Sequence, residues 1–68
     1  MKRDWLKEIR QSLGLSTYKA SEKIGISQSY YSAIENGKRG NPLSTDIAKA
    51  ISKAFNIDWT RFYESDTA

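Results

Sequence analysis

The chain has 68 residues, enough for one small domain. It contains no cysteine and no histidine, which excludes disulfides, thiolate metal sites, and the commonest metal ligand and general base. Eleven lysines and arginines against eight acidic residues give a net charge of +3, a mild basic bias that is compatible with nucleic acid but not diagnostic of it. No apolar run approaches the ~18 residues of a membrane span, so the sequence predicts a soluble, cytoplasmic protein without metal or cofactor.

Residues 4–13 form the first predicted helix. Its apolar side chains recur at i, i+3 and i+4 spacing on one face, and they are Trp5, Leu6, Ile9 and Leu13. Asp4 suits the positive end of the helix dipole, and Gly14 ends the helix. Three nearby cations are expected to be solvated, namely Lys2, Arg3 and Lys7.

The later helix starts share one pattern. An apolar residue precedes each N-cap residue and another lies four positions after the cap, which is the hydrophobic staple. The staple pairs are Leu15 with Ala20, Ile26 with Tyr31, Leu43 with Ala48, and Ile57 with Phe62. The corresponding caps are Ser16, Ser27, Ser44 and Asp58.

These caps predict helices at about 17–24, 28–36, 44–55 and 58–63. The sequence shows no alternating apolar run that would indicate a strand. We therefore predict an all-α, compact five-helix domain over residues 1–63, followed by a C-terminal tail at 64–68.

Residues 16–37 contain two short helices joined by a turn at Gly25, where glycine tolerates the left-handed conformation. On the wheel of the second helix, one side is apolar and consists of Tyr30, Tyr31 and Ile34. The opposite side is small, amide-bearing and nearly uncharged, and consists of Gln28, Ser29, Ser32, Ala33 and Asn36. Such a face can approach a DNA major groove, about 12 Å wide, and offer hydrogen bonds. The alternative is a surface helix that happens to be rich in serine.

The loop at residues 37–43 follows directly. Glycine and proline break both helix and strand there, and Lys38 and Arg39 are adjacent cations with no acidic residue between Glu35 and Asp46. Flexible cations and free backbone N–H groups suit phosphate oxygens. The alternative is a solubilising loop.

Residues 16–38 resemble the helix-turn-helix of the phage repressor and Cro family. The resemblance is carried by the turn glycine, the apolar spacing and the ending GluAsnGlyLys, that is, by Ala20, Ile24, Gly25, Ile26, Tyr31, Ile34 and residues 35–38. It extends over roughly residues 4–63. Two positions depart from the family pattern: Ser21, where alanine is usual, and Tyr31, where an aliphatic residue is usual.

The resemblance implies a DNA-binding domain whose helix-turn-helix is formed by helices 2 and 3. It also implies an ion pair between Arg10 and Glu35, the last residue but one of the third helix. In the family, the C-terminal end of the domain commonly carries the dimer contact. Here that end is aromatic and consists of Trp59, Phe62 and Tyr63.

The predicted function is sequence-specific binding of double-stranded DNA by a transcriptional regulator, a repressor of phage, prophage or plasmid type, that forms a homodimer at least on DNA. The expected base-reading residues are Gln28, Ser29, Ser32 and Ala33. The expected phosphate-binding residues are Thr17, Ser27, Asn36, Lys38, Arg39, Asn41 and Ser44. Cro-like proteins, toxin-linked antitoxins and restriction-system controllers share the fold and stay open as alternatives.

A second hypothesis is a protein-interaction module or antitoxin that uses the aromatic last helix as its partner surface. The small excess of positive charge favours this hypothesis, and the uncharged outer face of the third helix speaks against it. Without His or Cys, and without paired carboxylates at helical spacing, no catalytic constellation is recognisable, so no enzyme and no small-molecule substrate is predicted. The operator, the direction of regulation, any inducer and the presence of a further effector domain are left open by the sequence.

Overall fold

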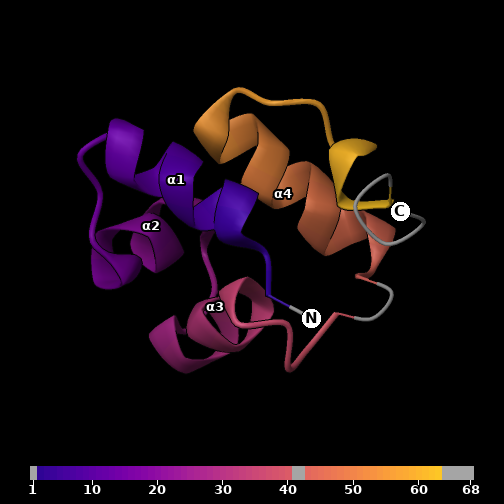
Figure 1. Cartoon of the computed structure of the whole chain (residues 1–68), viewed down its shortest axis with the longest axis horizontal. Coiled ribbons are helices and arrows are strands. Elements are labelled where there is room, and N and C mark those ends of the chain that lie inside the picture. The colour runs from indigo at the N-terminus through magenta and orange to yellow at the C-terminus, as the bar shows by residue number, and fades with distance from the viewer. Residues whose placement is uncertain (1, 41–42, 64–68) are drawn as a thin grey trace.

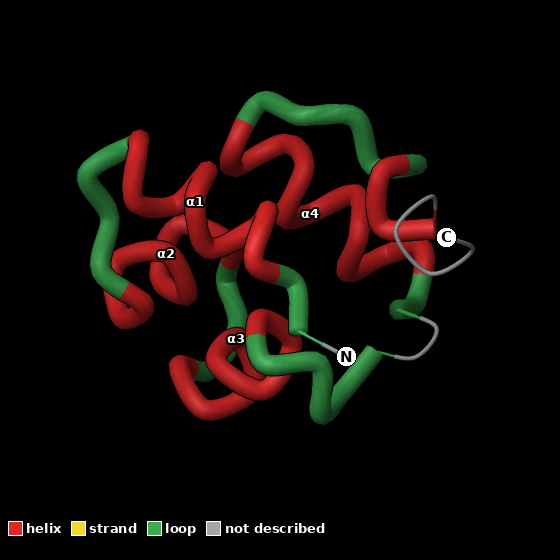
Figure 2. Tube along the Cα trace, in the orientation of Figure 1, coloured by secondary structure: helices red, strands yellow, loops and turns green. Residues whose placement is uncertain are grey.

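The computed structural model describes residues 2–40 and 43–63. Four α-helices are formed, α1 (Asp4–Ser12), α2 (Thr17–Ile24), α3 (Gln28–Glu35) and α4 (Thr45–Phe55), and a fifth helical segment covers residues 61–63 (Figure 1). Helices and loops account for all of the described chain, with no strand among them (Figure 2). The prediction of an all-α, five-helix domain is therefore confirmed. The predicted tail at 64–68 lies outside the described residues.

Three helices begin at the serines that the staple pattern indicated. The hydroxyl oxygen of each cap accepts a hydrogen bond from the backbone N–H three residues later, in Ser16–Lys19, Ser27–Tyr30 and Ser44–Ile47. The carboxylate of Asp58 accepts from the backbone N–H and the hydroxyl of Thr60, and both bonds lower the pKa of Asp58. Four helix boundaries differ from the prediction. Leu13, Asn36 and Ser44 are caps of α1, α3 and α4 and lie outside those helices. The last helix was predicted at 58–63 but covers only residues 61–63, because residues 59 and 60 form a turn.

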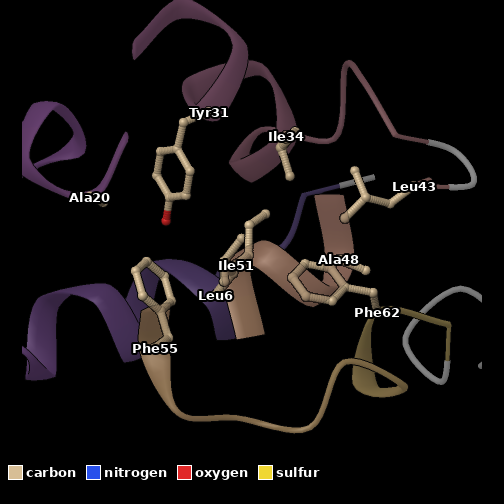
Figure 3. Packing of buried hydrophobic residues seen from close by; sticks show 9 residues of the cluster. All are labelled: Leu6, Ala20, Tyr31, Ile34, Leu43, Ala48, Ile51, Phe55 and Phe62. Atoms are coloured by element: carbon tan, nitrogen blue, oxygen red, sulfur yellow. The ribbon is translucent and has the colours of Figure 1, made fainter. Parts of the chain in front are cut away.

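The core lies where the helices converge, and α2 packs against both α3 and α4 while α1 packs against α3. Figure 3 shows Tyr31 reaching from α3 toward Phe55 of α4, with the two rings edge to face and their centroids 6.2 Å apart. The fully or almost fully buried apolar residues are Leu6, Ala20, Tyr31, Ile34, Leu43, Ala48, Ile51, Phe55 and Phe62. One face of α3 is thus committed to the core, and the opposite face is left at the surface.

The aromatic residues of the C-terminal end mainly close this core. Phe62 is fully buried and packs edge to face against Trp5, with ring centroids 5.0 Å apart. The rings of Trp59 and Tyr63 pack against each other, and the hydroxyl of Tyr63 donates to the carbonyl oxygen of Leu43 at 2.8 Å. Phe62 was expected at a partner surface, but its side chain faces inward because it fills the space beside Trp5. Only Trp59 and Tyr63 keep partly exposed surface.

The described residues contain neither a membrane-spanning helix nor a cluster of metal-binding side chains. None of the helices there is long and apolar enough to cross a membrane. Within residues 2–40 and 43–63, no group of three or more side chains of the metal-binding types comes together.

Candidate nucleic-acid interface

Helix α3 lies at one edge of the molecule (Figure 1). Its inner side chains Tyr31, Ile34 and Glu35 are buried. The predicted base-reading residues are on the other side, where Gln28 and Ser29 are exposed and Ser32 and Ala33 are partly buried. The structure therefore places the four residues on an accessible and uncharged surface of one helix.

The start of α3 is joined to the start of α2. The side-chain amide nitrogen of Gln28 donates a hydrogen bond to the hydroxyl oxygen of Thr17 at 2.9 Å. The turn between the helices allows this contact because Gly25 adopts a left-handed conformation, with φ of 93°. One predicted base-reading residue and one predicted phosphate-binding residue are thus in direct contact.

A surface hollow of about 410 Å³ lies beside α3. It is lined by five residues of α3 and its flanks, namely Ser27, Ser29, Tyr30, Ala33 and Arg39. The hollow brings together two expected base-reading residues and two expected phosphate-binding residues. Tyr30 was assigned to the apolar side of the helix, but it is only partly buried and forms part of the wall. Its position at the border of the apolar stripe is the signal that could have indicated this.

The loop after α3 holds the two adjacent cations at the surface. Lys38 and Arg39 are exposed, and their backbone N–H groups both donate to the carbonyl oxygen of Ala33, at 2.9 and 3.3 Å. Asn36 is exposed, and its amide donates to the carbonyl oxygen of Ser32 at 2.9 Å. Both cations thus extend from a loop backbone that is anchored on α3.

Two other predicted phosphate-binding residues are N-caps of helices. Ser27 and Ser44 are exposed helix caps whose hydroxyl oxygens accept backbone hydrogen bonds, which leaves each O–H able to donate. Ser44 caps α4 and does not line the hollow beside α3. Asn41 lies outside the described residues.

An ion pair fixes the C-terminal end of α3 to α1. Arg10 contacts Glu35 through two bonds, Nε to Oε2 at 2.8 Å and Nη2 to Oε1 at 3.1 Å, and donates from Nη1 to the carbonyl oxygen of Leu15. About one-tenth of each charged side chain is exposed, at 10% for Arg10 and 9% for Glu35. The hydrogen bond to Glu35 raises the pKa of Arg10. Burial first, and then the neighbouring Glu35, raises the pKa of the Tyr31 hydroxyl.

The expectation that Arg3 is solvated is wrong. Its residue exposure is only 1%, because the side chain turns back toward the end of α3 and donates to backbone carbonyl oxygens there. Arg3 precedes α1 and so has no place in that helix's apolar pattern, and backbone acceptors leave no signature in the sequence. Its neighbours Lys2 and Lys7 are exposed, as expected.

Comparison with known proteins gives a consistent result. A family model described as helix-turn-helix, of the Cro/C1 type, matches residues 6–62. The chain is 38% identical over 64 residues to YqaF of Bacillus subtilis (strain 168), an uncharacterized HTH-type transcriptional regulator, and the match covers 94% of this chain and 82% of that protein. It is 33% identical over 61 residues to the propionyl-CoA carboxylase regulator of Cereibacter sphaeroides, covering 90% of this chain but 13% of that much longer protein. The match over most of the domain, together with the α2–turn–α3 geometry, shows that the chain belongs to the Cro/C1-type helix-turn-helix family of transcriptional regulators.

Proposed function

We propose that the chain binds duplex DNA sequence-specifically by inserting α3 into the major groove, and that it acts as a repressor of phage, prophage or plasmid type. The observation that best supports this proposal is the outer face of α3, which is polar, uncharged and continuous with a hollow that reaches Arg39. Side chains on this face are short enough for the helix to approach base edges closely. The cations sit beside the helix and not on the face, which is the arrangement expected when bases and phosphates are contacted by different residues.

Gln28 is the principal base-reading residue in this proposal. A carboxamide has two N–H donors and one oxygen acceptor, and the bond to Thr17 uses one donor. The second donor and the oxygen suffice for a bidentate pair with the edge of adenine. Thr17 accepts from Gln28 and keeps its own O–H to donate to a phosphate, so the contact aligns both residues for their separate tasks. Ser29, Ser32 and Ala33 supply the shorter polar and methyl contacts.

Phosphate contacts in this proposal come from the rims of α3. Lys38 and Arg39 provide the charge on one side, and Thr17 on the other side provides a hydroxyl near the N-terminus of α2. Ser27, Asn36, Asn41 and Ser44 complete the proposed set. These contacts fix the register of α3 without reading sequence.

We further propose that two copies bind DNA with two-fold symmetry, because one short helix reads few base pairs. The two copies of α3 would then lie about 34 Å apart, one turn of duplex. The competing function is a protein-interaction module or antitoxin that uses the aromatic C-terminal end. Since Phe62 is fully buried, that surface would rest on Trp59 and Tyr63.

Selection of bound sites from random duplex DNA tests the proposal. A two-fold-symmetric consensus, with binding that weakens steeply as salt rises, is the expected result. A consensus with a single half-site and saturation at one chain per duplex would contradict the dimer. The absence of any preferred sequence, or the absence of DNA binding even at low salt, would favour the protein-interaction module.

A further inference from the structure

The residue just before α1 is bonded to the end of α3 and the loop after it. Nη1 of Arg3 donates to the carbonyl oxygens of Ile34 at 2.7 Å and Arg39 at 3.2 Å, and Nη2 donates to the carbonyl oxygen of Gly40. The backbone N–H of Arg3 donates to the carbonyl oxygen of Glu35 at 2.9 Å. Figure 1 shows the N-terminal segment running down from α1 to lie beside α3. A single residue thus holds four carbonyl groups within residues 34–40.

Arg3 acts as a cap for the C-terminal end of α3, although it comes from a segment that is distant in the sequence. The last four carbonyl groups of an α-helix have no partner within the helix and carry its partial negative charge. Ile34 and Glu35 belong to this group in α3. A buried guanidinium is costly unless its N–H groups are bonded, and its planar fork can serve several acceptors at once. The buried charge of Arg3 is therefore placed where the backbone offers acceptors.

The loop held by Arg3 has a defined backbone. Gly40 adopts a positive φ of 75°, and a Cβ added there would collide with the side chain of Leu43. The backbone N–H groups of Lys38 and Arg39 both donate to the carbonyl oxygen of Ala33 in α3. The segment is consequently fastened from α3 and from the N-terminal segment together, while the side chains of Lys38 and Arg39 remain exposed.

We propose that Arg3 is a positioning residue for the phosphate-binding loop, which it holds in one conformation without touching DNA itself. The inference rests on the proposed function, because it assigns the loop to DNA phosphates. A loop that is ordered before binding loses less conformational entropy on binding. Removing the hydrogen bonds from Arg3 to the loop should therefore weaken binding to preferred and random duplexes alike, because in this proposal the loop contacts phosphates and not bases.

The test combines backbone amide hydrogen exchange with DNA affinity in three variants. Arg3→Gln removes the charge and the fork, Arg3→Lys keeps the charge but loses the fork, and Lys2→Gln is the matched control, removing a neighbouring exposed cation. In both Arg3 variants we expect the amides of Lys38 and Arg39 to exchange at least about tenfold faster relative to core amides of α4. Affinity for both duplexes should fall roughly fivefold to tenfold in Arg3→Gln, while Lys2→Gln leaves loop exchange unchanged.

Other outcomes would overturn the inference. A purely structural role of Arg3 would speed exchange in the loop and in α4 by the same factor. Unchanged loop exchange, or a looser loop with unchanged DNA affinity, would equally exclude a positioning role. If neither Arg3 variant folds, the wild-type protein decides, because exchange of the Lys38 and Arg39 amides at unfolded-chain rates would show that the loop is not held in one conformation and would exclude the inference. Failure of the wild type to bind any duplex would instead overturn the proposed function.

Discussion

The two ends of α3 are held very differently. At its start, one exposed hydrogen bond joins Gln28 to Thr17, and the side chains around it face solvent. At its end, the buried Glu35 is paired with Arg10, and the backbone of the last turn is bonded to Arg3. One helix thus combines an adaptable end, suited to meeting a varied surface, with a fixed end that sets its angle to the rest of the domain.

The largest expected effect is at the fixed end. Arg10→Met and Glu35→Gln each leave one charge buried without its partner, so each should lower the free energy of unfolding by about 3–5 kcal/mol. The double variant removes both charges and should lose less stability than either single variant. Urea denaturation of the wild type and the three variants measures this, and equal stability of the three variants would contradict a cost from the lone buried charge.

A substitution at the adaptable end of α3 should change the affinity for DNA but hardly change the free energy of unfolding. Gln28→Ala is expected to lose about 1–3 kcal/mol of binding free energy on the preferred site and little on random duplex. Gln11→Ala is the matched control, because Gln11 is an exposed glutamine at the end of α1. An equal loss on both duplexes would show that Gln28 does not read bases.

The buried hydroxyl of Tyr31, beside Glu35, should make the folded state less stable at alkaline pH. Because the pKa of Tyr31 is raised above its usual 10.0, the folded state holds the proton more tightly than the unfolded chain does. This stabilisation is complete below pH 10 and is lost as the pH rises further, by at most about 1.4 kcal/mol per pH unit. Unfolding measured between neutral and strongly alkaline pH should show a steeper loss for the wild type than for Tyr31→Phe. Parallel curves would indicate that Tyr31 ionises freely in the folded protein.

The smallest effect is expected on DNA affinity, from a substitution of Lys38 in the loop after α3. Lys38→Ala should weaken binding to preferred and random duplexes alike and lower the slope of log affinity against log salt by about one. Lys53→Ala, an exposed lysine of α4, is the control and should leave the slope nearly unchanged. A change in sequence preference instead of slope would move Lys38 from the phosphates to the bases.

The parts of the molecule that depend on neighbouring residues were predictable from the sequence. The serine caps and staples define where α2, α3 and α4 begin, because the bonds span only three residues. The outer face of α3 followed from helical periodicity. Arg10 and Glu35 were paired through the family resemblance, since their separation of 25 positions carries no local signal.

Features that depend on the angle between elements were not predictable. Gln28 and Thr17 were both expected in the site, but their bond depends on how the turn at Gly25 orients two helices. Phe62 was expected at a partner surface, because the sequence does not show the space beside Trp5 that its side chain fills. Arg3 was misassigned because its acceptors are backbone oxygens that any sequence possesses.

The contacts of Arg3 also imply an order of folding. They join residues that are 31, 36 and 37 positions apart, whereas each helix and each serine cap is closed by bonds between near neighbours. Local contacts form first, and contacts across a long loop must wait until its closure entropy is repaid by packing. The N-terminal segment should therefore be the last part to dock during refolding and the first to detach during unfolding. Substitutions at Arg3 would then act mainly on the unfolding rate and leave the folding rate almost unchanged.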